Sequence, residues 1–406
     1  MIKGKNIISI IDLGSSKITC FIAKKNFSND IEILATAQTK SRGVKSGLII
    51  NLEAAKESIL KVIEVAENIA SEKVTSIYIG VNSSFLISNR NIIYLTLSNQ
   101  EVTINDMNKI LFKAIEKYNK QEVELIHTLP YEYILDGNKG ITHPLGLHGN
   151  KITSLFHIIT SPINYINNIE KCLEKCQLSV SGYISTGYAS GLACLNNNEV
   201  DFGSVVIEIG AETTTASVFY NKNVIFTDGL PYGGVNITRD IAKVLNLEFD
   251  VAEKLKIFHG SVNSSTISID ELINIGELFN LNEELSISTK ELSDIITARI
   301  TEILDLIKDK LIENDMLDVI NKIIITGGSA QLIGISELTQ KLFAIKSRLG
   351  KPINNIGLSD EYSSYPFAVP IGMLKNINNI TSTNKNLLQN ESNVFQKTWK
   401  WLKENF

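Results

Sequence analysis

Apolar positions along the chain follow two periods, and segments of the two kinds alternate. Short runs rich in Ile, Val and Phe are typical of buried strands, whereas apolar residues every three to four positions indicate amphipathic helices. Strands are predicted at residues 7–11, 18–23, 74–81, 205–209, 215–220 and 318–326. Helices are predicted at residues 52–70, 237–245, 250–259, 289–312 and 335–343. This alternation predicts an α/β fold.

Two segments far apart in the chain share one local pattern. In the first, strand 7–11 leads into Asp12-Leu13-Gly14-Ser15-Ser16-Lys17 and then into strand 18–23. In the second, strand 205–209 leads into Gly210-Ala211-Glu212-Thr213-Thr214 and then into strand 215–220. Each pattern is typical of a hairpin whose turn holds glycine, hydroxyl groups and an acid. The repetition predicts two lobes built on one plan.

Residues 84–160 form a separate unit between these hairpins. Its strands are predicted near 86–88, 91–97, 131–135 and 151–160, with a helix at 104–119 and a glycine-rich loop at 137–149. The unit carries no phosphate-loop chemistry of its own, so we interpret it as an inserted subdomain. Near the other end, residues 376–393 are rich in Asn, Ser, Thr and Lys, which predicts a flexible linker.

Composition narrows the class of protein. The chain has 406 residues, a length typical of two or three domains, with 44% hydrophobic and 20% charged residues. Its net charge of −5 argues against a general nucleic-acid-binding surface. No run of about 18 apolar residues occurs, and the N-terminal segment predicts a strand rather than a signal peptide, so we expect a cytosolic protein. Four cysteines are too few for a disulfide scaffold, and Cys172 and Cys176 are interpreted as buried thiols.

The two turns are candidate phosphate-binding loops. Phosphate oxygens need convergent backbone N–H donors, and glycine lets the backbone approach them closely. The first turn adds hydroxyl groups, an ammonium group and an acid that could hold Mg²⁺ through water, from Asp12, Gly14, Ser15, Ser16 and Lys17. The second turn offers a similar set, Glu208, Gly210 and Thr213. Two such turns from two lobes could grip a polyphosphate from both sides.

Three further segments extend this candidate site. Gly233-Gly234-Val235-Asn236 opens a predicted helix, whose N-terminus favours an anion. Gly327-Gly328 lies between a strand and a helix, where a base or ribose could rest against bare backbone. Glu253 and Lys256 could contact the ribose and base, or they could form an ordinary surface ion pair. Neither a Walker A sequence nor G-x-G-x-x-G occurs.

These features, in this order, resemble the actin-like ATPase superfamily and, within it, the FtsA family of bacterial cell-division proteins. The stretches that carry the resemblance are Ser41-Arg42-Gly43, His127–Tyr133, Pro144–Gly149, Pro231–Gly234, Ile257–Gly260 and Ile324–Gln331. The inserted unit at 84–160 lies where this family has its distinctive subdomain. The resemblance implies an actin-like (ribonuclease H-like) two-lobed fold. Its implied parts are a first lobe at 1–83 and 161–195, a second lobe at 196–234 and 306–375, and a helical subdomain at 235–305.

The resemblance also implies ligands, partners and a location. ATP and Mg²⁺ are expected between the lobes, with Asp12 and Glu208 linked to the metal through water and no catalytic residue assigned beyond Glu208. The expected nucleotide-binding residues are Asp12, Gly14, Ser15, Ser16, Lys17, Glu208, Gly210, Thr213, Gly233, Gly234, Asn236, Glu253, Lys256, Gly327, Gly328 and Gln331. Expected partners are the C-terminal peptide of FtsZ, further copies of the chain in filaments, anionic lipid and downstream division proteins. The expected location is the cytoplasmic face of the inner membrane at mid-cell.

Residues 394–406 predict a short amphipathic helix. At about 100° per residue, its large apolar side chains form a stripe about 60° wide. The stripe consists of Phe395, Trp399, Leu402 and Phe406, and the lysines beside and opposite it are Lys397, Lys400 and Lys403. Such a helix suits the interface of an anionic bilayer, the alternative being a helix that packs back on the domain. By resemblance, it is the membrane-targeting helix of the family.

The chain departs from the superfamily pattern in its second turn, which usually reads Asp-x-Gly-Gly-Gly-Thr. Glu208 is one methylene longer than the usual Asp and could still bind magnesium. Glu212 replaces a glycine and would repel phosphates unless it points away or meets the metal. Residues 185–191 offer hydroxyl groups but no Gln or Glu to orient an attacking water. We therefore expect nucleotide binding with weak or absent ATPase activity.

The sequence leaves three other functions open. A small-molecule kinase of the same superfamily would need a catalytic Asp facing a sugar pocket, and the sequence places none. A chaperone-type ATPase would need a substrate-binding domain that the final residues cannot supply. A pilus-assembly scaffold would differ in whether it binds the FtsZ tail peptide.

Overall fold

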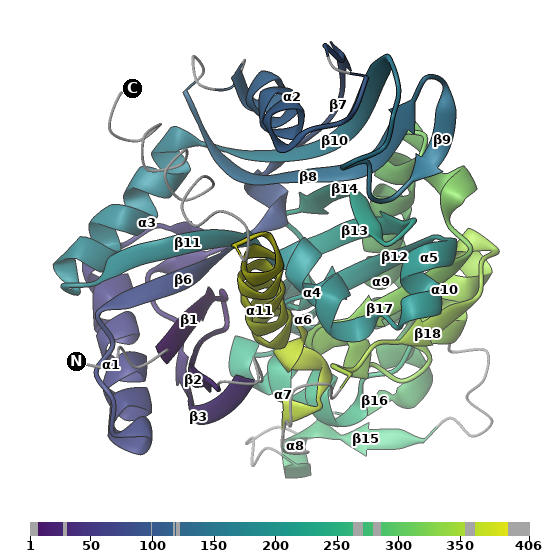
Figure 1. Ribbon diagram of the computed structural model, residues 1–406. Coiled ribbons are helices and arrows are strands. Elements are labelled where there is room, and N and C mark those ends of the chain that lie inside the picture. The colour runs from purple at the N-terminus through teal and green to yellow at the C-terminus, as the bar shows by residue number, and fades with distance from the viewer. Residues whose placement is uncertain are drawn as a thin grey trace.

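The computed structural model describes residues 7–26, 31–98, 100–116, 118, 122–262, 271–278, 286–353 and 362–388. Within residues 379–388 it describes the backbone only. Two sheets stand on either side of a central helix, and a third, smaller sheet lies at one end of the molecule (Figure 1). Among the described residues, no helix is both long enough and apolar enough to cross a membrane.

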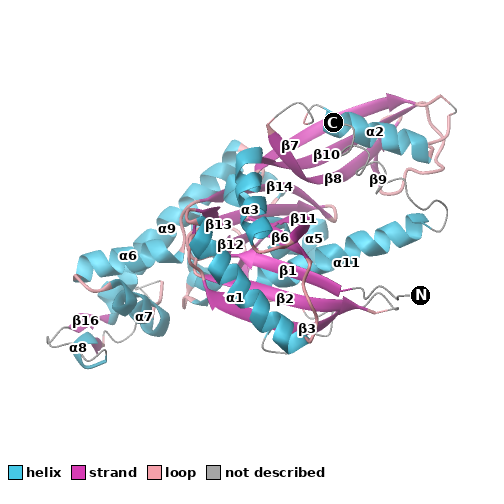
Figure 2. Cartoon of the chain, turned by 90° about the vertical axis from the view of Figure 1, so that its left-hand side faces the viewer, coloured by secondary structure: helices cyan, strands magenta, loops and turns pink. Residues whose placement is uncertain are grey.

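The first lobe is built on a five-stranded sheet. Its strands are β1 (Ile7–Leu13), β2 (Lys17–Lys25), β3 (Ile31–Lys40), β6 (Ser76–Val81) and β11 (Ser179–Ser185), in the order β11-β6-β1-β2-β3. Helices α1 (Leu52–Ala70) and α3 (Ile163–Lys175) pack against it, as Figure 2 shows for α1. Helix α1 has the predicted bounds, because the Asn51 side chain caps its N-terminus and Ser71 ends it in a left-handed conformation. A small hairpin of β4 (Val44–Lys45) and β5 (Leu48–Ile49) precedes α1.

The second lobe repeats this sheet. Its strands are β12 (Ser204–Ile209), β13 (Thr214–Tyr220), β14 (Asn223–Leu230), β17 (Lys322–Thr326) and β18 (Ser347–Leu349), in the order β14-β13-β12-β17-β18. In both sheets, three antiparallel strands are followed by two parallel ones. The register also agrees, since Asp12 lies opposite Thr19 on β2 and Glu208 lies opposite Thr215 on β13. The prediction of two lobes on one plan is confirmed.

Helices surround the second sheet and extend into a helical region. They are α6 (Gly234–Leu245), α7 (Phe249–His259), α8 (Ile275–Leu278), α9 (Thr289–Glu313) and α10 (Ile335–Phe343), with a two-stranded ribbon of β15 (Leu272–Asn274) and β16 (Ser286–Ser288). One hydrophobic core joins α6, α7 and α9 to strands β12, β13 and β17. The strand predicted at 318–326 begins later, at Lys322, because Leu317–Val319 forms a 3₁₀ turn.

Two helices fill the space between the lobes. Helix α4 (Thr186–Cys194) packs against α11 (Ala368–Leu388) in a core shared by strands of both sheets. The contact needs glycine, because a Cβ on Gly372 would lie 1.7 Å from the Ala189 carbonyl oxygen. The linker predicted at 376–393 is therefore wrong in its first part: α11 continues to Leu388, and Ile377 is still buried. Residues 389–393 lie outside the described part of the chain.

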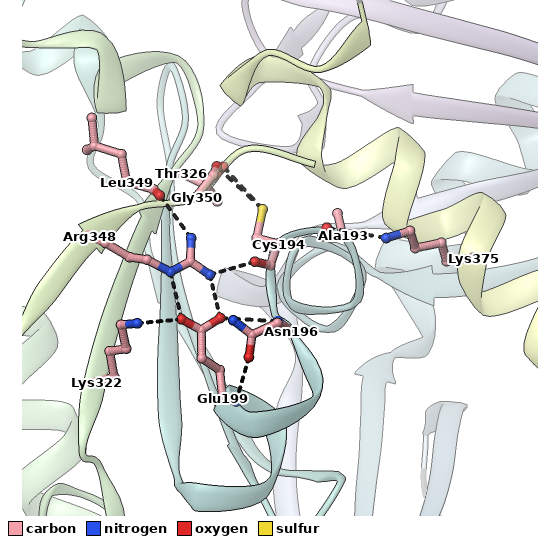
Figure 3. A network of polar contacts seen from close by, with 10 residues as sticks. All are labelled: Ala193, Cys194, Asn196, Glu199, Lys322, Thr326, Arg348, Leu349, Gly350 and Lys375. Atoms are coloured by element: carbon pink, nitrogen blue, oxygen red, sulfur yellow. Dashed lines mark hydrogen bonds and ion pairs between the residues drawn. The ribbon is translucent and has the colours of Figure 1, made fainter. Parts of the chain in front are cut away.

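A polar network fixes the C-terminal end of α4 (Figure 3). Arg348 donates to the Cys194 carbonyl oxygen (2.8 Å) and to the Glu199 carboxylate, which also accepts from Lys322 at 2.7 Å. Burial would raise the pKa of Glu199, but the bonds from Arg348 and Lys322 outweigh it and hold this pKa at about 2. Lys375 of α11 donates to the carbonyl oxygens of Ala193 and Ile353. Helix α5 (Asn197–Phe202), which carries Glu199, is thereby tied to β17, β18 and α4.

The inserted subdomain is a four-stranded sheet with one helix on it. The strands are β7 (Ile87–Thr96), β8 (Val123–Leu135), β9 (Asn138–Ile141) and β10 (Lys151–Pro162), in the order β7-β10-β8-β9, and the helix is α2 (Ile104–Glu116). The two strands predicted at 86–88 and 91–97 are one continuous strand, β7, and the predicted glycine-rich loop contains β9.

Two buried histidines attach this subdomain to the lobes. His127 Nε2 accepts a hydrogen bond from the Ser185 backbone N–H at 3.0 Å, at the end of β11. His157 lies 3.1 Å from the Val224 carbonyl oxygen of β14 through Nδ1, and 2.7 Å from Ser88 Oγ through Nε2. Burial lowers the pKa of His127 to about 4 and that of His157 to about 3. Both rings are therefore neutral near pH 7, and the subdomain contacts both lobes.

Candidate functional site

A cavity of about 680 Å³ lies between the two lobes, at the ends of β1 and β12. Most of the residues predicted to bind a nucleotide line it. They are Asp12, Gly14, Ser15, Ser16, Lys17, Glu208, Gly210, Thr213, Gly234, Glu253, Lys256, Gly328 and Gln331. The structure thus brings the two predicted turns together around one space.

Three of the predicted residues support the walls of this cavity from outside it. The Asn236 side chain accepts from the Gly233 N–H at 3.0 Å and so caps α6. A Cβ on Gly233 would lie 2.6 Å from the Gly210 carbonyl oxygen. Gly327 has a φ of +88°, and a Cβ there would lie 2.8 Å from Glu208 Oε1. These two glycines are required because the backbone passes so closely over the second turn.

Two carboxylates face the cavity from equivalent strands. Burial raises the pKa of Asp12 to about 6, although the positive charge of Lys17 opposes the shift. Burial, together with the nearby Asp12 carboxylate, raises the pKa of Glu208 to about 8, with the Thr215 hydroxyl opposing. A cation between them would favour the ionised form of both acids.

This pair fits a magnesium ion that is shared with a phosphate. Mg²⁺ is usually held by one or two carboxylates, several waters and substrate phosphates rather than by a cage of protein ligands. In keeping with this, no group of three or more Asp, Glu, His or Cys side chains in the described residues could hold a metal by itself. Asp12 and Glu208 are the residues that would hold the ion, which would supply positive charge beside the phosphates.

Three helix N-termini end at the same cavity. Thr186 of α4, Gly234 and Val235 of α6, and Ala368 and Val369 of α11 all line it. Each N-terminus carries a partial positive charge that favours an anion. The first N–H groups of α6 already donate to the Gly210 and Ala211 carbonyl oxygens of the second turn, so at this helix the charge rather than free donors would act on the ligand. The sequence indicated the α6 end. It missed the end of α11, although Pro366 just before the helix is a start signal of the usual kind.

Lys17 points toward the rim of the cavity. Its Nζ donates to Gln38 Oε1 at 3.3 Å and lies 5.1 Å from the centre of the Phe367 ring. Burial lowers its pKa, with Asp12 opposing. Lys17 therefore has partners of its own and contributes a positive charge close to Asp12.

The far end of the cavity is lined by α7 and the loop after β17. Lys256 Nζ donates to Glu253 at 2.7 Å and to the Gly234 carbonyl oxygen at 3.0 Å, so the two residues form an ion pair that lines the cavity. Their contact with a ribose or base stays a prediction. A Cβ on Gly328 would meet no atom within 4 Å. Apolar residues that the sequence did not indicate, Phe249 and Leu332 among them, complete this end. A flat, partly apolar group has room here.

Glu212 turns toward the opposite lobe. Its Oε2 accepts a hydrogen bond from the Ser46 backbone N–H at 2.6 Å, and its Oε1 lies 3.4 Å from Arg239 Nη2. The carboxylate is therefore paired at the edge of the cavity. The predicted repulsion of phosphates is reduced by these two partners, although Glu212 still lines the space.

Solved structures with the same architecture define the class of fold. The PilM–PilN type IV pilus biogenesis complex matches 91% of this chain and 98% of the solved chain, with a TM-score of 0.65 and 15% identity. The crystal structure of MreB5 of Spiroplasma citri bound to ADP matches 93% and 98%, with a TM-score of 0.56 and 15% identity. With the duplicated sheets and the cavity between them, these matches establish an actin-like fold.

Sequence comparison is more specific. The family model described as cell division protein FtsA matches residues 205–372, and the model of the SHS2 domain inserted in FtsA matches residues 85–160. Cell division protein FtsA of Agrobacterium fabrum is 32% identical over 385 residues, covering 92% of this chain and 87% of the relative. That of Neisseria meningitidis is 31% identical, covering 90% and 89%. The chain belongs to the FtsA family of cell division proteins.

Other predicted residues fall outside this site. The membrane-binding residues predicted between Phe395 and Phe406 lie outside the described part of the chain. All four cysteines are buried and free of disulfides, so the buried-thiol interpretation of Cys172 and Cys176 is confirmed.

Proposed function

We propose that this chain binds ATP with Mg²⁺ between its lobes and tethers FtsZ to the cytoplasmic face of the membrane at the division site. Three features of the cavity support nucleotide binding: two facing turns, two half-buried carboxylates with raised pKa values and three helix N-termini. The phosphates would lie beside the turns with the ion near Asp12 and Glu208, and the base would lie toward Gly328 and α7. This convergence is the observation that carries the proposal.

ATP acts mainly as a structural ligand in this proposal. Residues 185–191 carry small and hydroxyl side chains, and the Ser185 hydroxyl is within 3.1 Å of Ser83 Oγ and accepts from the Tyr188 N–H. No Gln or Glu from this segment is available to orient an attacking water. Binding would close the two lobes on each other, and hydrolysis would be slow or absent.

The scaffold part of the proposal rests on family membership and on the C-terminal sequence. The chain would self-associate into filaments, bind the C-terminal peptide of FtsZ and recruit downstream division proteins. Residues 394–406 would lie in the membrane interface, with Phe395, Trp399, Leu402 and Phe406 in the apolar layer. Lys397, Lys400 and Lys403 would each add up to about 1 kcal/mol on anionic lipid. One such helix is a weak anchor, so stable attachment needs several helices presented by a filament.

Co-sedimentation with anionic vesicles, with and without FtsZ, tests this function. Wild type should sediment and carry FtsZ with it, but not FtsZ lacking its C-terminal peptide. Trp399→Glu should release the protein, because it places a charge within the apolar stripe. Lys400→Glu is the matched control on the polar face, and it should weaken binding only at low salt. If Trp399→Glu still sediments, or if it unfolds, residues 394–406 pack against the domain and the membrane assignment is wrong.

A further inference from the structure

The hairpin β4–β5 of the first lobe reaches the edge of the cavity with a two-residue tip. Ser46 and Gly47 both have positive φ, 48° and 83°, and Lys45 pairs with Leu48 across them. This is the conformation of a type I′ turn, which is rigid and suits a two-residue hairpin. The tip therefore presents the Ser46 backbone N–H in a fixed direction.

The first lobe holds this tip in place from two sides. The Gly47 N–H donates to Ser15 Oγ at 3.3 Å, and the Gly47 carbonyl oxygen accepts from the Tyr165 hydroxyl at 3.1 Å. A Cβ on Gly47 would lie 2.9 Å from the Asn82 side chain, so the tip also packs closely on the segment after β6. Because Ser15 belongs to the first phosphate turn, the tip is hydrogen-bonded to that turn within the first lobe.

The second lobe contacts the same region through the second turn. Glu212 accepts a hydrogen bond from the Ser46 backbone N–H at 2.6 Å. The next residue, Thr213, accepts from Asn82 Nδ2 at 2.9 Å. The Glu212 side chain is only 13% exposed, so little water competes for this contact. Both hydrogen bonds must break if the lobes separate at this edge.

We propose that Glu212 is a latch that holds the cleft closed over the phosphate end of the nucleotide and sets the rate of nucleotide release. The latch rests on the proposed function for the ligand, but the contact between Glu212 and Ser46 joins the lobes by itself. Glu212 acts through the position of the lobes, so it is a positioning residue. Arg239, half exposed and 3.4 Å away, steadies the carboxylate and is the weaker of its two partners.

Two measurements on the full-length chain test the latch. Hydrogen–deuterium exchange at the Ser46 amide, without nucleotide, reads the contact directly. Release of a fluorescent ATP analogue, chased with excess unlabelled ATP, reads its consequence. Glu212→Ala should lose protection at Ser46 and release the analogue at least about tenfold faster, the factor expected for the loss of one charged hydrogen bond. Glu212→Gln, which keeps an acceptor without the charge, should lie between Glu212→Ala and wild type.

Ser46→Gly is the matched control, because glycine keeps both the N–H and the positive φ. It should leave protection and release near the wild-type values, and Arg239→Ala should change release less than Glu212→Ala does. Equal exchange at residue 46 in wild type and Glu212→Ala would overturn the latch, and so would lost protection with an unchanged release rate. If wild type binds no nucleotide, the proposed function fails, while the exchange measurement still decides whether the contact exists.

Discussion

The two phosphate turns occupy equivalent places in equivalent sheets, yet their side chains do different things. Each begins with an acid at the same register position, Asp12 opposite Thr19 and Glu208 opposite Thr215. After the glycine, the first turn continues with two serines and Lys17, all lining the cavity. The second continues with Glu212, whose carboxylate reaches across to Ser46. The two lobes therefore share a fold, but the polar side chains of their turns make different contacts.

The comparison shows that apolar residues determine the strands, whereas the contacts of a polar turn residue depend on the opposite lobe. Buried aliphatic residues on β1, β2, β12 and β13 build the same strands twice, so the backbone of the two turns is similar. The role of a turn side chain depends on what the opposite lobe presents to it. Glu212 finds a backbone donor across the cavity, whereas Lys17 finds Gln38 of its own lobe and the ring of Phe367, directly before α11.

The largest effect is expected at Gly328, in a part of the cavity wall that only the second lobe provides. Gly328→Asp should weaken ATP binding by at least about a hundredfold, ~2.7 kcal/mol, because a charged side chain would project into the open end of the cavity. Gly328→Ala is the control for loss of glycine, and it should change affinity by no more than about threefold, since its Cβ meets no atom within 4 Å. Isothermal titration measures both. Unchanged affinity in Gly328→Asp would remove this loop from the site.

Periodicity alone was enough to predict the elements that surround these turns. The helices at 52–70 and 335–343 have the bounds that their apolar faces indicate, and the paired hairpins predicted the duplicated sheets. The pattern of glycines and acids also identified the two turns that line the cavity. These features follow from local spacing, which a sequence displays directly.

Long-range partners could not be predicted in the same way. Neither Ser46 nor Glu212 indicates by its own surroundings that the other lies 2.6 Å away, since 166 positions separate them. The linker prediction failed from residue 376 for a similar reason. The Asn-rich end of α11 has a weak local preference for helix, but Asn376 and Ile377 are buried against the rest of the fold. Tertiary contacts override weak local preferences.

A smaller effect is expected where the inserted subdomain joins the first lobe. His127 is held neutral, with a pKa of about 4 against an ordinary 6.5, so the unfolded chain binds more protons between these values and stability rises with pH. Lowering the pH from 7 to 5 should therefore reduce the unfolding free energy by about 2 kcal/mol through this ring. Asp12 and Glu208, whose pKa values are raised, act in the opposite direction, so the comparison must be with a variant.

Urea unfolding of wild type and His127→Gln at pH 5, 6 and 7 isolates this contribution. Gln keeps an acceptor for the Ser185 N–H but does not titrate. Between pH 7 and pH 5, the unfolding free energy of His127→Gln should therefore fall by about 2 kcal/mol less than that of wild type. Identical slopes for wild type and His127→Gln would show that the join to the first lobe does not depend on a neutral ring.

The smallest effect addresses the two acids themselves. Asp12→Asn and Glu208→Gln each remove one charge with little change in size, and each should weaken binding of ATP with Mg²⁺ by about tenfold. With the metal chelated, Asp12→Asn should bind ATP as well as wild type or better, because a negative charge beside the phosphates is gone. Glu208→Gln should then bind ATP like wild type at pH 7, because the raised pKa of Glu208, about 8, leaves this acid largely neutral without a cation. If the two acids act through one ion, the double variant should lose much less than about a hundredfold, since the second substitution removes an interaction already lost. Independent, additive losses would mean separate roles. A loss in Asp12→Asn with none in Glu208→Gln would mean that the longer acid of the second turn no longer does the work of its counterpart in the first.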